Sequence, residues 1–94
     1  MKGYWIVRCR YNDQGAFEKY ASLTTEVVAK NHGRFLVRGG QQMQMENGHC
    51  ERTVLVEFPN METAKKVYQS KEYQAALKII KSSADRDFVI VEGL

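Results

Sequence analysis

A chain of 94 residues is long enough for one domain with a modest hydrophobic core. Hydrophobic residues make up 44% and charged residues 27% of it, which excludes an intrinsically disordered chain and is typical of a folded globular domain. The net charge of +3 arises from 14 basic and 11 acidic residues that are interspersed. We therefore expect a single domain over residues 1–94 and no nucleic-acid partner.

The sequence shows neither a targeting pattern nor a metal-binding pattern. No apolar run of about 18 residues is present, and residues 1–10 enter a short strand pattern without the apolar segment of a signal peptide. Cys9 and Cys50 have no neighbouring cysteine or histidine pair at the spacing of a zinc site. We expect a reduced, cytoplasmic protein with no membrane contact, no metal and no cofactor.

The first elements are a strand and a helix. Tyr, Trp, Ile and Val within residues 3–10 favour a strand. Asp13 is the expected N-cap of a helix whose apolar residues recur at helical spacing to about Asn31. We expect Gly33 to end this helix as its left-handed residue.

A hairpin follows. Residues 34–45 read as a second strand with a bulge or bend at Gly39-Gly40, and residues 50–58 read as a third strand. The Asn47-Gly48 dipeptide between them predicts a tight hairpin turn.

The last part of the chain predicts a helix and a strand. Asn60 is a suitable N-cap, and Ser70 can cap a continuation, so this helix is expected to be bent or split. Residues 85–92 form the last strand. The order βαββαβ predicts an α+β, ferredoxin-like sandwich: a four-stranded antiparallel sheet with both helices on one face, and the first and third strands as parallel neighbours at its centre.

All four strand patterns are apolar on both faces, although the two helices cover only one of them. A half-solvated strand would alternate apolar with polar residues. From strand spacing and rise, the uncovered face would be on the order of 400 Å², a large apolar patch for a monomer. The sequence therefore predicts a homodimer that pairs through its sheet faces.

Several segments together resemble a widespread bacterial family of small proteins of unknown function in the dimeric α+β barrel superfamily. These segments are Gly33-Arg34-Phe35-Leu36-Val37-Arg38-Gly39-Gly40, Glu51-Arg52-Thr53-Val54-Leu55-Val56-Glu57-Phe58-Pro59 and Val89-Ile90-Val91-Glu92-Gly93, with Tyr68, Ser70 and Tyr73 between them. The resemblance implies a ferredoxin-like protomer that pairs sheet to sheet. The superfamily includes cofactor-free monooxygenases, haem-degrading enzymes, muconolactone isomerases and proteins without known catalysis. The chain departs from the family pattern at Ile80-Lys81, where relatives often have Arg, and at His32, where a small residue is common.

Glu57 is the first candidate for chemistry. It lies near the end of the third strand, where a buried carboxylate would need a partner from Arg38, Arg52 or Arg8. Such a group either holds a ligand carboxylate, with Glu57 orienting an arginine or acting as a base, or forms a structural ion pair.

Aromatic residues provide a second candidate group. Trp5, Tyr20, Tyr68 and Tyr73 come from the first strand and both helices, and their rings either shape a sheet–helix pocket for a small organic molecule or fill the core. His32 is either a general acid or base, or a favourable cation at the end of the first helix.

Together these residues favour a homodimer that binds, and as an enzyme would transform, a small aromatic or carboxylated metabolite without a cofactor. Arg38 and Arg52 would hold its negative group, Trp5, Tyr20 and Tyr68 would shape the pocket, and the catalytic candidates are Glu57 and His32. The alternative is a non-catalytic dimerisation module without a ligand.

Overall fold

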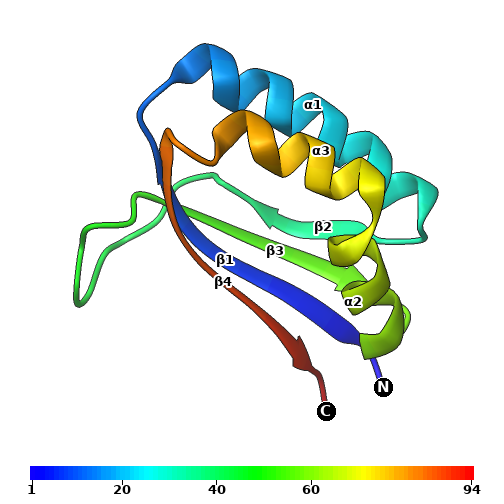
Figure 1. The fold of residues 1–94 in the computed structure, drawn as a ribbon. Helices are drawn as coiled ribbons and strands as arrows, with labels where there is room; N and C mark the ends of the chain where they lie inside the picture. Colours follow the sequence, from blue (N-terminus) through cyan, green and yellow to red (C-terminus); the bar gives the residue numbers. More distant parts are fainter.

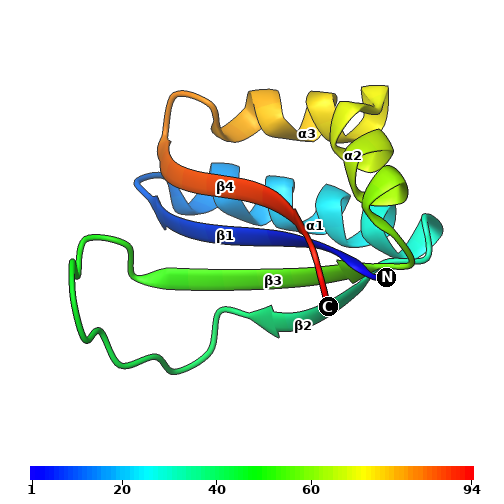
Figure 2. The same ribbon diagram turned by 90° about the horizontal axis from the view of Figure 1, so that it is seen from below.

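The computed structural model describes residues 1–94 as one sheet with helices on one of its faces (Figures 1 and 2). In chain order the elements are β1 (Gly3–Tyr11), α1 (Gln14–Lys30), β2 (Arg34–Arg38), β3 (Arg52–Phe58), α2 (Met61–Gln69), α3 (Lys71–Ile80) and β4 (Ala84–Glu92).

The sheet has the strand order β2-β3-β1-β4, and every neighbouring pair is antiparallel. This arrangement confirms the antiparallel ferredoxin-like fold. The expectation that the first and third strands are parallel was wrong: β1 and β3 pair antiparallel along Gly3 to Cys9. The crossover through α1 brings β2 parallel to β1, and the connection that follows β2 reverses the chain, so β3 runs opposite to β1.

The β2–β3 connection is longer than the sequence pattern predicted. β2 ends at Arg38, because Gly39 and Gly40 have φ angles of 72° and 81° and turn the chain away from the sheet. The bulge lies earlier, where the register with β3 shifts between Phe35 and Val37. Residues 39–51 therefore form a loop instead of a tight Asn-Gly hairpin, and the loop drops to the side of the sheet opposite the helices (Figure 1).

Glutamine side chains and one arginine hold this loop in place of a strand ladder. The Gln42 and Gln44 side-chain amides donate hydrogen bonds to the Cys50 carbonyl at 3.1 and 2.7 Å. Arg8 donates to the same carbonyl at 3.2 Å and to the Gln44 side-chain oxygen at 3.2 Å. The loop is thus tied to β1 by side chains.

The helix caps follow the sequence prediction. The carboxylate of Asp13 accepts the Ala16 amide at 3.0 Å, and Asn60 caps α2. Ser70 is extended, with φ −64° and ψ 151°, and its hydroxyl accepts the amide of Tyr73. The second helical region is therefore split into α2 and α3 at Ser70, as the sequence indicated.

The core is centred on Trp5 of β1. Its ring packs at 5.0 to 6.4 Å from the rings of Phe58, Tyr68, Tyr73 and Phe88, and its indole N–H donates to the Ala64 carbonyl at 2.9 Å. These contacts fasten α2 and α3 to the sheet. α1 packs chiefly against α3. None of the three helices combines the length and the apolar character that a membrane crossing requires.

His32, rather than Gly33, is the left-handed residue after α1, with φ 64°. Gly33 is required for a different reason: a Cβ at this position would lie 2.6 Å from a ring carbon of Phe58, so only glycine fits there. The amides of His32 and Gly33 donate to the carbonyls of Ala29 and Val28, which closes the end of the helix.

We expect His32→Gly to raise the free energy of unfolding by about 0.5–1 kcal/mol, because glycine adopts the left-handed conformation without the penalty of a Cβ. Urea melts measure this change. His32→Ala is the control and should give no gain, since alanine keeps the Cβ. A loss of stability in His32→Gly would show that the imidazole itself holds the fold.

Candidate functional site

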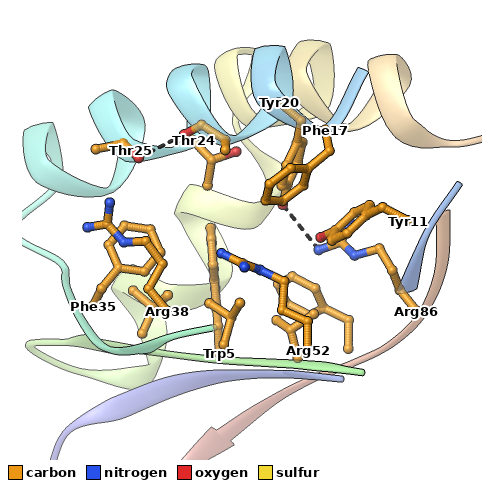
Figure 3. A pocket seen from close by; sticks show the side chains of 15 residues that line it. Trp5, Tyr11, Phe17, Tyr20, Thr24, Thr25, Phe35, Arg38, Arg52 and Arg86 are labelled. Atoms are coloured by element: carbon orange, nitrogen blue, oxygen red, sulfur yellow. Dashed lines mark hydrogen bonds between the residues drawn. The ribbon is translucent and has the colours of Figure 1, made fainter. Parts of the chain in front are cut away.

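A cavity of about 50 Å³ lies between α1 and the sheet. Figure 3 shows Phe17, Tyr20 and Thr24 descending into it from α1, while Trp5 and the arginines rise from the strands. Three guanidinium groups line its walls, and we call this cavity the arginine pocket. Its arginines are Arg38 at the end of β2, Arg52 at the start of β3 and Arg86 in β4.

Each of these arginines is placed by an aromatic ring. The guanidinium carbon of Arg38 lies 3.9 Å from the ring centroid of Phe35, and that of Arg52 lies 4.8 Å from the ring centroid of Phe17. Arg86 lies 5.2 Å from the ring of Tyr20. Such stacking orients the planar cations and leaves their N–H groups free for oxygen acceptors.

Arg86 is also fixed by hydrogen bonds. Its Nη2 donates to the hydroxyl oxygen of Tyr20 at 3.1 Å (Figure 3) and to that of Tyr73 at 3.2 Å. The two hydroxyl oxygens lie 2.7 Å apart. One phenolic proton is used between the two oxygens. The other cannot be donated to Arg86, which has no acceptor, so this cluster contains one phenolic proton more than it can use.

The pocket as a whole has an excess of donors. No Asp, Glu or His lines it, so its three positive charges face no carboxylate. Arg52 Nε and Arg86 Nε are buried without a hydrogen-bond partner, as is the hydroxyl of Thr24. Buried donors without acceptors are costly, and a ligand that carries anionic oxygens would satisfy them.

Burial keeps the phenols of the pocket region protonated. Tyr73 is fully buried, and its pKa is raised by loss of solvent and by the neighbouring Tyr20. Burial also raises the pKa of Tyr11, and the adjacent Cys9 adds to the effect. Both phenols are therefore neutral hydrogen-bond donors at physiological pH.

The structure brings together four of the residues singled out from the sequence, since Trp5, Tyr20, Arg38 and Arg52 all line the arginine pocket. Tyr68 does not line it. Its ring packs in the core behind the pocket, 6.4 Å from that of Trp5.

Glu57 lies on the opposite face of the sheet. Its neighbours in β3, Val56 and Phe58, point toward the helices, so Glu57 points away from them. There it accepts a hydrogen bond from Tyr4 at 3.2 Å and pairs with Arg34 at 3.4 Å. The partners expected from the sequence, Arg38, Arg52 and Arg8, do not contact it, because the register places Arg34 opposite Glu57.

His32 is exposed and lies with Glu57, Arg34 and Lys2 in a shallow polar depression, away from the arginine pocket. Neither of the catalytic candidates from the sequence, Glu57 and His32, therefore lines the arginine pocket.

Arg86 is the main residue that the sequence analysis missed. It stands between Asp85 and Asp87 in the last strand, and the sequence analysis assigned it no role. The signal that could have found it is the parity of β4, because Arg86 lies on the same face as Phe88. Ile80 is fully buried and Lys81 is exposed, so α3 contributes no cation to the pocket.

No group of three or more His, Cys, Asp or Glu side chains gathers in the structure. Cys9 and Cys50 are both buried and free, and burial raises the pKa of the Cys9 thiol. Cys9 packs as a small apolar side chain in the core.

A four-stranded antiparallel sheet with its helices on one face, in the order βαββαβ, defines a ferredoxin-like α+β protein. Residues 2–94 match the family described as "Domain of unknown function (DUF1330)", and the chain belongs to this family. No curated protein sequence matches it.

Solved structures share this fold. A protein of unknown function from Rhodopseudomonas palustris is 13% identical and superposes with a TM-score of 0.80, covering 99% of this chain and 82% of its own. A dimeric ferredoxin-like protein of unknown function from Jannaschia sp. CCS1 is 13% identical, with a TM-score of 0.78 and coverage of 99% and 100%. SnoaB, a cofactor-independent oxygenase from Streptomyces nogalater, is 9% identical, with a TM-score of 0.64 and coverage of 99% and 93%.

The buried phenols predict a loss of stability at alkaline pH. The pKa of Tyr73 is higher in the folded protein than the value of about 10 in the unfolded chain, so the unfolded state loses the proton first. The free energy of unfolding should hold up to about pH 10 and fall above it. Urea melts from pH 8 to pH 11 measure this. Tyr73→Phe should make the decline shallower, and an unchanged slope would mean that Tyr73 does not ionise on unfolding.

Proposed function

We propose that the protein binds a small organic anion, an aromatic or carboxylated metabolite, in the arginine pocket. The observation that carries this proposal is the excess of hydrogen-bond donors: three guanidinium groups line a cavity that contains no acidic side chain, and the Tyr20–Tyr73 hydroxyl pair beside Arg86 holds a phenolic proton without an acceptor. A carboxylate supplies both the negative charge and the acceptor oxygens that these groups lack.

Each residue of the arginine pocket has a role that follows from its position. Arg86 is held by two tyrosines and serves as the fixed donor, and Arg38 and Arg52 neutralise charge on the sheet side. Trp5 and Tyr20 give the pocket its apolar walls. The neutral phenol beside a guanidinium also suits the stabilisation of negative charge that develops on a ligand oxygen, as in an enolate.

Support for a cofactor-free reaction comes from fold analogy. SnoaB, described as a cofactor-independent oxygenase, has the same fold, but the likeness is one of fold alone. In this chain the groups near the pocket can bind an anion and stabilise an oxyanion, and no side chain that lines the pocket is an Asp, Glu or His base.

Carboxylated aromatic compounds should raise the melting temperature saturably, because a ligand that binds only the folded state stabilises it. Their methyl esters, which lack the charge, should not. Arg86→Met should weaken binding about 10- to 100-fold, as expected for a lost charged hydrogen bond of about 1.5–3 kcal/mol. Thermal-shift and calorimetric titrations measure both effects.

The matched control is Arg34→Met, which removes an arginine outside the arginine pocket. It should leave ligand affinity unchanged. Equal shifts from acids and esters, or equal losses in the Arg86 and Arg34 variants, would contradict an anion site in this pocket.

We further propose that the protein is a homodimer assembled through the open face, the side of the sheet opposite the helices. One row of apolar side chains crosses all four strands there. This row consists of Val37, Leu55, Ile6 and Val89, which are partners in the strand register. Ile6 is 37% exposed and Val89 is 48% exposed. A row of adjacent apolar side chains exposed to this extent is unusual in a monomer.

The β2–β3 loop adds apolar surface on the same side. Met43 and Met45 are 82% and 78% exposed, although the loop that carries them is held by hydrogen bonds to Arg8 and the Cys50 carbonyl. A stable interface needs about 800 Å² from each partner, which the face alone falls short of and the loop helps to supply. The Jannaschia protein of the same fold is described as dimeric, which supports this assembly.

Light scattering should give about twice the chain mass of 10.8 kDa at micromolar concentration. Ile6→Glu should shift the protein to a monomer, because it would bury an unpaired charge at the centre of the interface. Lys65→Ala, which changes an exposed residue of α2, is the control and should remain dimeric. A monomeric wild type would overturn the dimer.

A further inference from the structure

We propose that the arginine pocket takes a carboxylic acid with a single ring, and that Arg52 is the gate residue whose side chain moves to admit it. This inference deepens the proposed function and rests on it. It comes from the size of the cavity and from the unequal way in which its arginines are held.

The arginine pocket as it stands is too small for a ring. Its volume is about 50 Å³, whereas a cavity of about 150 Å³ is the size known to take up benzene. Only an anion of a few atoms, such as acetate, fits without movement of a wall. A ring-bearing acid therefore requires one wall to open.

A second space lies on the other side of one wall. A groove of about 220 Å³ runs past Gly39 and Gly40 on the outside, and it shares Tyr11, Phe17 and Arg52 with the arginine pocket. These shared side chains form the partition between the two spaces. If the partition opened, the joined space would lie near the lower end of the ~300–1,000 Å³ range of ligand sites, which suits one ring with its carboxylate.

Arg52 is the partition member that can move at low cost. Its guanidinium makes no hydrogen bond or ion pair, its Nε has no partner, and its only specific contact is the stack on Phe17 at 4.8 Å. The rings of Tyr11 and Phe17 instead pack on each other at 4.5 Å. Arg86, deeper in the pocket, is fixed by two tyrosine hydroxyls.

The backbone beside Arg52 is shaped to its side chain. A Cβ on Gly39 would clash with Nη1 of Arg52, so the guanidinium rests directly against the backbone of the loop. On this account Arg52 leaves its place between Gly39 and Phe17, the acid enters from the groove, and the guanidinium then pairs with the bound carboxylate together with Arg86.

Stopped-flow and calorimetric titrations with acetate, benzoate and 2-naphthoate test this inference. Wild type should bind acetate and benzoate and exclude 2-naphthoate. Arg52→Ala should raise the association rate constant of benzoate at least tenfold, because the gate is gone, while raising the dissociation rate constant further, because one charge is lost. Arg38→Ala, the matched control, should weaken binding without faster association.

The outcomes separate the two proposals. If benzoate binds and its association rate is the same in Arg52→Ala as in the wild type, Arg52 is not the gate; if 2-naphthoate binds as tightly as benzoate, the single-ring limit is wrong. If none of the three acids binds, the proposed function itself fails. Arg52→Lys keeps the charge but not the planar stack on Phe17, and it should also speed benzoate association, which gives a second reading if the alanine variant does not fold.

Discussion

The packing of α1 over the sheet and beside α3 is the constraint on which the site depends. The aromatic cluster around Trp5 holds α2 and α3 to the sheet, and its members fill the space below them tightly. At the C-terminal end of α1, Val27 and Val28 are buried in the core. Toward its N-terminal end, Phe17 and Tyr20 face the guanidinium groups of Arg52 and Arg86 as well as aromatic rings. The cavity lies at this second end, where the three arginines line it.

The three arginines that line the pocket do not favour stability of the fold. Three like charges around one pocket repel one another, and the half-buried Arg52 and Arg86 also lose water without gaining a carboxylate. Aliphatic residues at these positions would fill the space without that cost. Conflict between local composition and stability is typical of functional sites, where the missing partner is supplied by a ligand. The salt bridge of Glu57 with Arg34 on the open face shows the contrasting case, in which an ion pair is complete within the chain.

Much of the fold follows from short-range rules in the sequence. Asp13, Asn60 and Ser70 each accept an amide of the first turn that follows, and the doubly apolar strands describe a sheet with one covered and one open face. These features depend on neighbours in the chain and on the alternation of side chains, which the sequence displays directly.

The less predictable features depend on register and backbone conformation. Glu57 shares a face of the sheet with Leu55, but which arginine it meets is decided by the pairing of β2 with β3 and by a bulge within β2. The left-handed residue after α1 was expected to be a glycine, whereas the contact of Gly33 with Phe58 requires glycine for its size and leaves the left-handed position to His32. Arg86 joins two tyrosines that are 66 and 13 residues away in sequence, a contact that only the folded chain creates.

The arginine pocket and the open face are built on the same strands and meet at the β2–β3 loop. Arg38 directly precedes this loop and Arg52 directly follows it, and the Gly39 amide donates to the Thr53 carbonyl at 2.9 Å to close its base. The loop itself reaches the open side (Figure 1), and its methionines, Met43 and Met45, are exposed. A partner seated on the open face would thus contact a segment whose two ends carry pocket arginines. Contacts with that partner would restrict the loop backbone against which Arg52 rests. Dimer assembly and access to the arginine pocket would then both depend on the conformation of the β2–β3 loop.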